Sequence, residues 1–383
     1  MFIDLTDDQR ALQAELRRYF SSLVSPEEAA IMRTERHGPT YREVVRRMGK
    51  DGWLGVGWPV EFGGRGFGDV EQQIFANEAV RADVPLPSVT LQTVGPTLQV
   101  YGTDEQKRKF LPAILAGEVH FAIGYSEPEA GTDLAALRTT AVCDGDHYIV
   151  NGQKIFTTGG HDADYIWLAV RTGPADSRHR GISVLIVDTK DPGFSWTPII
   201  TCDGAHHVNA TYYSDVRVPV EMLVGEENKG WKLITTQLNH ERVMLGPAGR
   251  VAGIYDRLVE WVSAHELQDR PEVRRALGEI HATWRLNELL NWQVAASSND
   301  AVDIADASAT KVFATERIQR VGRLAEEIVG ALGDPADDDT ADLLRWLDMM
   351  AKRNVVITFG GGVNEVMREL IATAGLGMPR VPR

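Results

Sequence analysis

The sequence predicts an α+β protein in which a helical first third and a helical last third flank a β-rich middle segment. Helical periodicity dominates the first third, and it returns after Gly230-Trp231. Between about residues 121 and 225, short β-branched runs alternate with turn dipeptides. There is no strand–helix alternation of the parallel α/β type and no internal repeat. We therefore expect three domains, at residues 1–120, 121–228 and 229–383.

The first third carries two helix-start patterns. Thr6 precedes Gln9 by three residues, and Thr103 precedes Gln106 in the same way, as in a capping box. The residues that then share one helical face are Leu12, Leu16, Tyr19 and Phe20. Pro59–Gly68 is rich in glycine and predicts a loop.

The middle segment reads as a small antiparallel β-domain. Asp144-Gly145 and Asn151-Gly152 are dipeptides typical of tight turns, and Asp146–Val150 between them is β-rich. Tyr165–Val170 and Ile182–Val187 are further strand-like runs.

Two long helices are expected in the last third, at Gly278–Ser298 and Ala314–Gly333. The acidic stretch Asp334–Asp342 predicts a loop. The apolar residues spaced four apart, Leu324, Ile328 and Leu332, predict a helix-packing surface, at an oligomer interface or elsewhere.

Composition narrows the class of protein. The 40 Lys+Arg and 54 Asp+Glu residues give a formal net charge of −14, which argues against nucleic acid or an anionic membrane as the main partner. Cys143 and Cys202 have no metal-type spacing and suit a reducing compartment. The acidic N-terminus does not resemble a signal peptide, and no apolar run reaches 18 residues. We expect a cytoplasmic protein.

Several motifs occur in a consistent order between about residues 5 and 260. They are Glu61–Gly64, Gly102–Lys107 with Phe110–Pro112, Tyr125–Asp133 (YSEPEAGTD), Asn151–Gly160 (NGQKIFTTGG) and Val224–Trp231. Together they resemble the acyl-CoA dehydrogenase family. The resemblance implies that family's fold: an N-terminal helical domain, a middle β-domain and a C-terminal helical bundle. It also implies FAD as cofactor and an acyl-CoA thioester as substrate.

The resemblance assigns cofactor contacts to Tyr125, Ser126, Thr132, Phe156 and Thr158. Hydroxyl groups suit the flavin edges near N1/O2 and N5, because negative charge collects there on reduction. Ser126 and Thr158 have hydroxyls at those positions, Phe156 replaces the family's usual Trp, and Thr132 would face the pyrophosphate. The alternative is that Ser126 and Thr132 are turn residues and Phe156 belongs to the core.

The reaction of the family removes a proton from Cα of the thioester and a hydride from Cβ, the hydride going to flavin N5. It therefore needs one carboxylate aimed at Cα. In most members this glutamate lies near the C-terminus. The matching segment here is Thr358–Glu365, and it places Gly360 where the glutamate is expected.

A minority of the family carries the glutamate in a Leu-x-x-Glu-Arg pattern on the first long C-terminal helix. Leu238–Arg242 matches that pattern, so the resemblance implies Glu241 as base. A lone glutamate on a helix is otherwise a solvated surface residue. We expect Arg242 and Asn239 to contribute to substrate binding, with Arg242 positioning either the acyl-CoA or the base.

The glycine run has a second possible use. The family's equivalent of the Gly360 amide polarises the thioester carbonyl, so Gly360 is a further candidate for substrate binding. Gly360, Gly361 and Gly362 also leave side-chain volume free. We hypothesise that a bulky or α-branched acyl group lies there.

Two motifs that donate flavin contacts to a neighbouring subunit in the family are degraded. Val262–Pro271 lacks the Arg-x-x-Phe-Gly motif, and Glu326–Gly333 lacks the Gln-x-x-Gly-Gly-x-Gly motif. A heteromer with a related acyl-CoA dehydrogenase-like subunit fits this loss. The pattern is similar to the α2β2 enzymes of actinobacterial sterol side-chain degradation, and it suggests a steroid-CoA substrate.

An electron-transfer flavoprotein is the expected electron acceptor. The rival interpretations are an acyl-CoA oxidase that uses oxygen, a flavin monooxygenase of similar fold, and a noncatalytic partner subunit of a related dehydrogenase. His206-His207 and the other histidines show no metal-type spacing, so no metal site is expected.

Overall fold

The computed structural model describes residues 4–297 and 303–379, with the side chains of residues 238–245 and 297 left undescribed. The chain divides into two compact units. The helical unit comprises Met1–Leu23, Gly68–Leu86 and Asn239–Arg383, and the β-containing unit comprises Val24–Phe67 and Pro87–Leu238. Both units are therefore built from segments that are far apart in the sequence.

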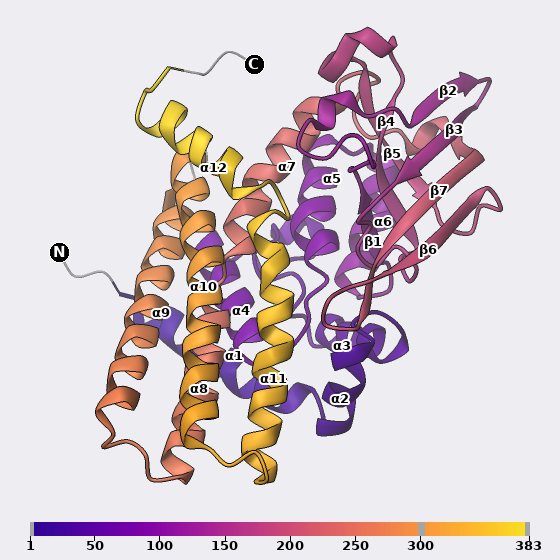
Figure 1. Ribbon diagram of the computed structural model, residues 1–383. Helices are drawn as coiled ribbons and strands as arrows, with labels where there is room; N and C mark the ends of the chain where they lie inside the picture. The colour runs from indigo at the N-terminus through magenta and orange to yellow at the C-terminus, as the bar shows by residue number, and fades with distance from the viewer. Residues whose placement is uncertain (1–3, 298–302, 380–383) are drawn as a thin grey trace. The chain divides into compact units, whose positions relative to one another are not determined.

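The helical unit is a bundle in which α8 to α11 run side by side (Figure 1). Its helices are α1 (Asp7–Leu23), α4 (Asp69–Arg81), α8 (Gly249–Ala264), α9 (Pro271–Ser297), α10 (Ile304–Leu332), α11 (Asp338–Val355) and α12 (Asn364–Leu370), with the short turns η6 (Val356–Thr358) and η7 (Ile371–Gly375). The helix α7 (Gly230–Leu245) spans the division between the units. Ile328 is buried in the core of the bundle and Leu324 and Leu332 pack against that core, which confirms the predicted packing surface.

The β-containing unit combines short helices with one sheet. The helices are α2 (Pro26–Thr34), α3 (Pro39–Lys50), α5 (Gly95–Tyr101) and α6 (Asp104–Leu115), and the short turns are η1 (Val60–Phe62), η2 (Val89–Val94), η3 (Leu134–Ala136), η4 (Ala175–Gly181) and η5 (Val220–Met222). The strands are β1 (Phe121–Gly124), β2 (Thr140–Asp144), β3 (His147–Lys154), β4 (Tyr165–Arg171), β5 (Ile182–Asp188), β6 (Phe194–Ile200) and β7 (His206–Pro219). Helices, then strands, then helices follow one another along the chain, as the predicted α+β class requires.

Within the described residues the sheet has seven strands, in the order β1-β4-β2-β3-β7-β6, with β5 pairing with β4. The β2–β3, β3–β7, β6–β7 and β4–β5 pairs are antiparallel, as predicted. In contrast, β1 is parallel to β4, and so is β2 at its single pair with β4. The predicted Asn151-Gly152 turn is wrong. Both residues lie inside β3, where the pairing with β7 shifts register between Val150 and Gly152.

Hydrogen bonds to side chains fix the predicted helix starts. Thr6 and Gln9 bond each other's backbone N–H groups, and Thr103 and Gln106 do the same. Both capping boxes are confirmed. The expected acidic loop is wrong in its second half, because α11 begins at Asp338. Carboxylates in the first turn of a helix are favoured by the exposed N–H groups there.

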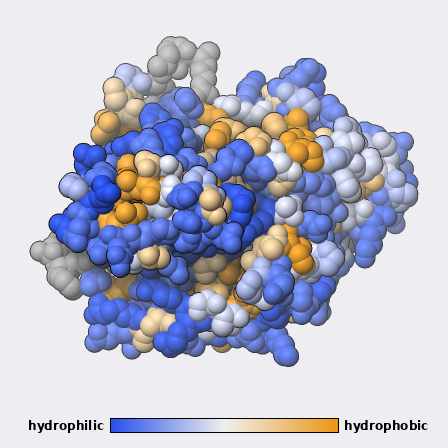
Figure 2. Space-filling model, turned by 60° about the horizontal axis from the view of Figure 1, so that its bottom comes forward, coloured by the Kyte–Doolittle hydropathy of each residue, from blue (hydrophilic) through white to orange (hydrophobic). Residues whose placement is uncertain are grey.

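Among the described helices, none is long and apolar enough to span a membrane. Figure 2 shows a face on which hydrophilic residues predominate and hydrophobic residues form separate patches. This surface agrees with a sequence in which charged residues make up 25% of the chain.

Candidate functional site

Two segments that follow strands meet in the β-containing unit. The Tyr125–Glu127 segment follows β1, and the Ile155–Thr158 segment follows β3. The Ile155 N–H donates to the Ser126 carbonyl oxygen at 2.9 Å. The structure therefore brings the Ser126 and Phe156 parts of the expected cofactor site together, although 30 positions separate them in the sequence.

A buried ion pair joins the Tyr125–Glu127 segment to the end of β3, next to the Ile155–Thr158 segment. Lys154 is the last residue of β3, and its side chain is fully buried. Its Nζ donates to Glu127 Oε1 at 2.8 Å and to the Tyr125 carbonyl oxygen at 3.0 Å. Glu127 also accepts the Arg138 and Thr139 backbone N–H groups, at 2.7 and 2.8 Å. Lys154 therefore bonds to both neighbours of Ser126, and Glu127 connects them to the Arg138–Thr139 backbone.

The electrostatics of the pair follow from its burial. Burial lowers the pKa of Lys154 to about 8, although Glu127 acts in the opposite direction. Burial alone would raise the pKa of Glu127. The Lys154 cation and the hydrogen bonds from Thr139 and Arg138 outweigh that effect and lower it. At neutral pH both groups are charged.

Phe156 has an unusual backbone for a bulky residue. Its φ is 62°, in the left-handed region, and its side chain is 63% exposed. The next residue is fixed, because Thr157 and Asn209 exchange backbone hydrogen bonds of 2.9 and 3.2 Å. An exposed aromatic ring on a left-handed backbone is a candidate for a functional position. Phe156 is thus not part of the core, which removes the alternative interpretation for this residue.

The expected hydroxyl groups are accessible. Ser126 is half-buried, and Thr132 and Thr158 are exposed. In the described part of the chain none of these three hydroxyls has a hydrogen-bond partner. Together with the Phe156 ring, Ser126 and Thr158 offer what a flat polar-edged cofactor needs: an aromatic wall and free donors.

Tyr125 differs from its neighbours. Its side chain is buried, and its hydroxyl bonds the Gln237 side chain and accepts the Trp167 Nε1–H at 3.2 Å. Gln237 in turn donates to Thr97 Oγ1 at 2.9 Å. The Tyr125 hydroxyl is therefore committed to the interior, and its carbonyl oxygen is bonded to Lys154. The Tyr125 side chain therefore packs beneath the Ser126 segment as a buried support and presents no polar group to a cofactor.

Lys154, Glu127 and Gln237 were not predicted as parts of the site. One signal was available for Lys154. Tyr148 and Val150 are inward-facing residues of β3, and Lys154 shares their even-numbered alternation. A lysine at an inward position of a strand indicates a buried cation with a partner.

The predicted base and its neighbours lie in α7. Glu241, Asn239 and Arg242 belong to the residues whose side chains fall outside the described part of the structure. Their assigned roles stay predictions.

The glycine run joins η6 to α12 in the helical unit. The Gly360 N–H donates to the Val356 carbonyl oxygen at 2.9 Å, so this amide is already bonded. The expectation that it is free to polarise a thioester carbonyl therefore does not hold for this conformation. A Cβ at Gly360 would come no closer than 3.5 Å to a neighbouring atom. Local packing does not demand glycine there, which is consistent with space kept for a ligand.

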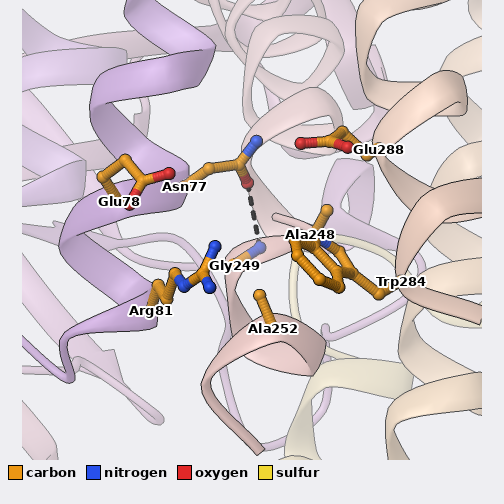
Figure 3. Close-up of a pocket in the computed structure, with 8 residues that line it drawn as sticks. All are labelled: Asn77, Glu78, Arg81, Ala248, Gly249, Ala252, Trp284 and Glu288. Carbon is orange, nitrogen blue, oxygen red and sulfur yellow. Dashed lines mark hydrogen bonds between the residues drawn. The ribbon is translucent and has the colours of Figure 1, made fainter. Parts of the chain in front are cut away.

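One polar cavity of the helical unit, drawn in Figure 3, is too small for substrate or cofactor. It measures about 10 Å³, enough for one water molecule. Its lining residues are Asn77, Glu78, Arg81, Ala248, Gly249, Ala252, Trp284 and Glu288. Burial raises the pKa of Glu288, and Asn77 Oδ1 accepts the Gly249 N–H at 3.1 Å. This polar cavity is a packing feature of the bundle.

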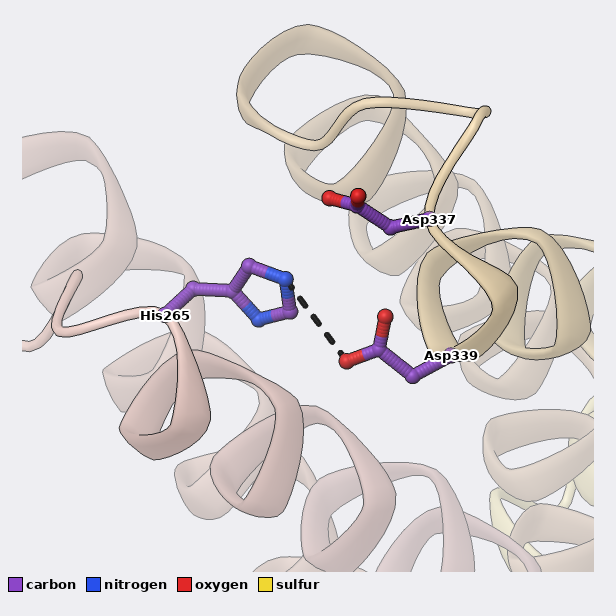
Figure 4. Close-up of side chains that lie close together, drawn as sticks. All are labelled: His265, Asp337 and Asp339. Atoms are coloured by element: carbon purple, nitrogen blue, oxygen red, sulfur yellow. Dashed lines mark ion pairs between the residues drawn. The ribbon is translucent and has the colours of Figure 1, made fainter.

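The segment with the first degraded donor motif lies at one end of the bundle. There His265, Asp337 and Asp339 lie close together (Figure 4). His265 Nε2 is 3.6 Å from Asp339 Oδ2, and its Nδ1 is 2.9 Å from the Trp261 carbonyl oxygen. Both aspartates are exposed. The geometry is that of a surface ion pair, and the three residues do not by themselves make a metal site.

Comparison with known proteins agrees with this architecture. The chain matches the acyl-CoA dehydrogenase N-terminal domain over residues 6–118, the middle domain over 122–216 and the C-terminal domain over 228–376. It is 73% identical to acyl-CoA dehydrogenase FadE29 of Mycobacterium tuberculosis, with 100% of both chains covered.

Two solved structures are also similar over the whole length. A chain of the Tcur3481-Tcur3483 steroid ACAD is 48% identical, with a TM-score of 0.93 and 100% of both chains covered. A chain of the ChsE4-ChsE5 complex from Mycobacterium tuberculosis is also 48% identical, with a TM-score of 0.91 and the same coverage. The family consists of flavoproteins that generally use FAD. The chain belongs to the acyl-CoA dehydrogenase family and is an acyl-CoA dehydrogenase.

Proposed function

We propose that the chain catalyses the FAD-dependent α,β-dehydrogenation of a bulky acyl-CoA, of steroid type, as one subunit of a heteromer. The observation that carries the cofactor assignment is the junction of Ser126, Phe156 and Thr158. It combines an exposed aromatic ring on a left-handed backbone with free hydroxyls, and the buried Lys154–Glu127 pair holds it in place. In this proposal Thr132 contacts the pyrophosphate and Tyr125 supports the site.

Glu241 is proposed as the base. Its carboxylate takes the proton from Cα of the thioester, and the β-hydrogen leaves as hydride, so that a Cα=Cβ double bond forms. FAD, when bound, would supply the acceptor for that hydride. Gly360 replaces the C-terminal glutamate of most family members, so Glu241 in α7 supplies the carboxylate that the reaction needs. Arg242 and Asn239 are proposed to position the substrate.

Two observations support a bulky acyl group. The Gly360–Gly362 run carries no side chains, and a Cβ added at position 360 would come no closer than 3.5 Å to a neighbouring atom. The two similar solved structures are a steroid ACAD and the ChsE4-ChsE5 complex. A strict preference for short straight-chain acyl-CoA substrates would contradict this part of the proposal.

A related subunit is the proposed partner, in an α2β2 arrangement, with an electron-transfer flavoprotein as electron acceptor. The degraded motifs at Val262–Pro271 and Glu326–Gly333 support it, because this chain then depends on another subunit for a complete flavin site. Two of the similar structures carry names of two paired proteins. We also propose that the domains divide at residues 1–120, 121–228 and 229–383.

The test of the base compares Glu241→Gln with Glu260→Gln, an exposed glutamate of α8, in the complex of the chain with its partner. Glu241→Gln is expected to lower turnover by at least about a thousandfold with flavin content unchanged, because the amide cannot take the Cα proton. Glu260→Gln is expected to behave like the wild type. Unchanged turnover in Glu241→Gln would favour a noncatalytic subunit.

The dependence on another subunit for a complete flavin site is tested by the ratio of FAD to polypeptide. This ratio is measured first for the chain alone and then for the chain with a related subunit. A low ratio that rises towards one FAD per heterodimer supports the proposal. One tightly bound FAD per chain without a partner refutes it. Rapid peroxide release in air during turnover would instead indicate an acyl-CoA oxidase.

A further inference from the structure

Lys311 is a buried lysine of α10 whose ammonium group lies against the segment between α11 and α12. Its side chain is 0% exposed. Nζ donates to the Thr358 carbonyl oxygen at 3.1 Å, to the Gly362 carbonyl oxygen at 2.7 Å and to Asn364 Oδ1 at 2.8 Å. An ammonium group has three N–H donors, and these three acceptors are its hydrogen-bond partners in the segment between α11 and α12.

The bonds of Lys311 close the glycine run into a loop. Two of its acceptors are backbone carbonyls on either side of Gly360, and both are drawn to one nitrogen atom. Gly361 and Gly362 have positive φ angles of 63° and 104°. Glycine has the greatest backbone freedom of all residues, so a run of three needs outside contacts to keep one conformation.

Asn364 extends the attachment to a second turn of α10. It is 3% exposed, and its Nδ2 donates to Thr315 Oγ1 at 3.1 Å and to Glu316 Oε1 at 3.2 Å. Thr315 follows Lys311 by one helical turn. Figure 1 shows α12 beside α10, where these contacts occur. The C-terminal end of the loop is thus fixed to α10 at two successive turns.

Stability alone does not call for a lysine here. Removing an ammonium group from water costs several kcal/mol, and a methionine of similar length would fill the same space without that penalty. What an apolar side chain does not provide is the attachment of two carbonyls and an amide to one point. The desolvation cost of the Lys311 ammonium group is therefore offset by a gain in loop structure: three acceptors of the loop are bonded to one nitrogen atom.

We propose that Lys311 is a positioning residue, which holds the Gly360–Gly362 loop in the conformation that the acyl-CoA substrate requires. This inference rests on the proposed function, which places the acyl group beside Gly360. Lys311 acts through the loop and takes no part in proton or hydride transfer.

The experiment compares Lys311→Met with Lys352→Met, an exposed lysine of α11, in the flavin-containing complex. Hydrogen exchange of the amides in residues 358–364 is expected to become at least tenfold faster in Lys311→Met, while exchange in α8 stays the same. With a CoA thioester of a polycyclic acid, KM is expected to rise at least tenfold, with flavin content unchanged and a smaller change in kcat. Lys352→Met is expected to match the wild type in each measurement.

Asn364→Ala provides a second variant if Lys311→Met does not fold, because it removes one acceptor and leaves the other two. Smaller changes in the same direction are expected. Unchanged exchange and unchanged KM in the variants would overturn the inference. A faster loop with unchanged KM would overturn the substrate role of Lys311 and leave the proposed function standing. Absence of acyl-CoA turnover in the wild-type complex would overturn the proposed function, while the exchange measurement still decides whether Lys311 fixes the loop.

Discussion

Replacing Lys154 by methionine removes the cation of the buried pair and leaves the Glu127 carboxylate in the interior of the β-containing unit. Glu127 is 8% exposed, and among the described residues its remaining hydrogen-bond donors are the N–H groups of Arg138 and Thr139, with the Arg171 cation near enough to interact with it. Breaking a buried ion pair on one side costs about 3–5 kcal/mol, because an uncompensated charge stays behind. The same change removes the Lys154 hydrogen bond from the Tyr125 carbonyl oxygen. We therefore expect both the free energy of unfolding and the flavin content to fall.

Because of the lowered pKa of Lys154, the free energy of unfolding should depend on pH. The folded value is about 8 and the unfolded value 10.5, so between these limits the unfolded chain binds more protons. The stability contributed through Lys154 must then rise with pH in that window, by up to about 1.4 kcal/mol per unit. From pH 7.5 to 9.5 the wild type should gain about 2 kcal/mol relative to Lys154→Met.

A double-mutant cycle separates the pair from its surroundings. Urea unfolding of the wild type, Lys154→Met, Glu127→Gln and the double variant, at pH 7.5 and 9.5, gives the coupling free energy. Because an apolar or neutral replacement of both partners is far less costly than removal of one, the double variant should lose less than the sum of the single losses. Additive losses with no dependence on pH would refute the reasoning.

Two further predictions concern Phe156 and Thr340. Phe156→Gly should relieve the left-handed backbone and leave the free energy of unfolding unchanged or up to about 1 kcal/mol higher, while flavin content falls; Phe156→Ala should lose flavin without that relief. A larger stability loss in Phe156→Gly than in Phe156→Ala, measured by urea unfolding, would contradict the strain. Thr340→Val removes the buried hydroxyl that accepts the Trp261 Nε1–H at 3.0 Å, and should cost about 1–3 kcal/mol in urea unfolding. Thr340→Ser keeps the acceptor and should lose clearly less; equal losses in the two variants would rule out the hydrogen bond as the cause.

Local signals predicted the parts of the fold that local interactions determine. The Thr6 and Thr103 capping boxes are examples, because their hydrogen bonds join residues three apart. Ser25 and Glu28 form a third box of the same type, which the same pattern would have found. The order of helices and strands follows from periodicity for the same reason.

Long-range contacts explain what the sequence did not predict. Asn151-Gly152 has the composition of a turn, but pairing of β3 with β7 continues through it. The backbone of Gly152 passes so close to Thr139 that a Cβ would lie 2.6 Å from Thr139 Oγ1. Glycine is needed here for close packing of a bulged strand rather than for a reversal of the chain. The parallel pairing of β1 with β4 likewise depends on residues 44 positions apart, such as Phe121 and Tyr165.

Lys154 and Lys311 were not predicted to be buried, because lysine is usually found at the protein surface. Each donates to backbone carbonyls of an irregular segment, Lys154 beside Ser126 and Lys311 around Gly360–Gly362. An ammonium group on a flexible stem can bind acceptors that are not coplanar, whereas the planar guanidinium of arginine fits a carboxylate or phosphate fork. Arginine at either position would therefore keep the charge and still misplace the segment. The geometry of the acceptors, rather than the charge alone, determines why lysine stands at both places.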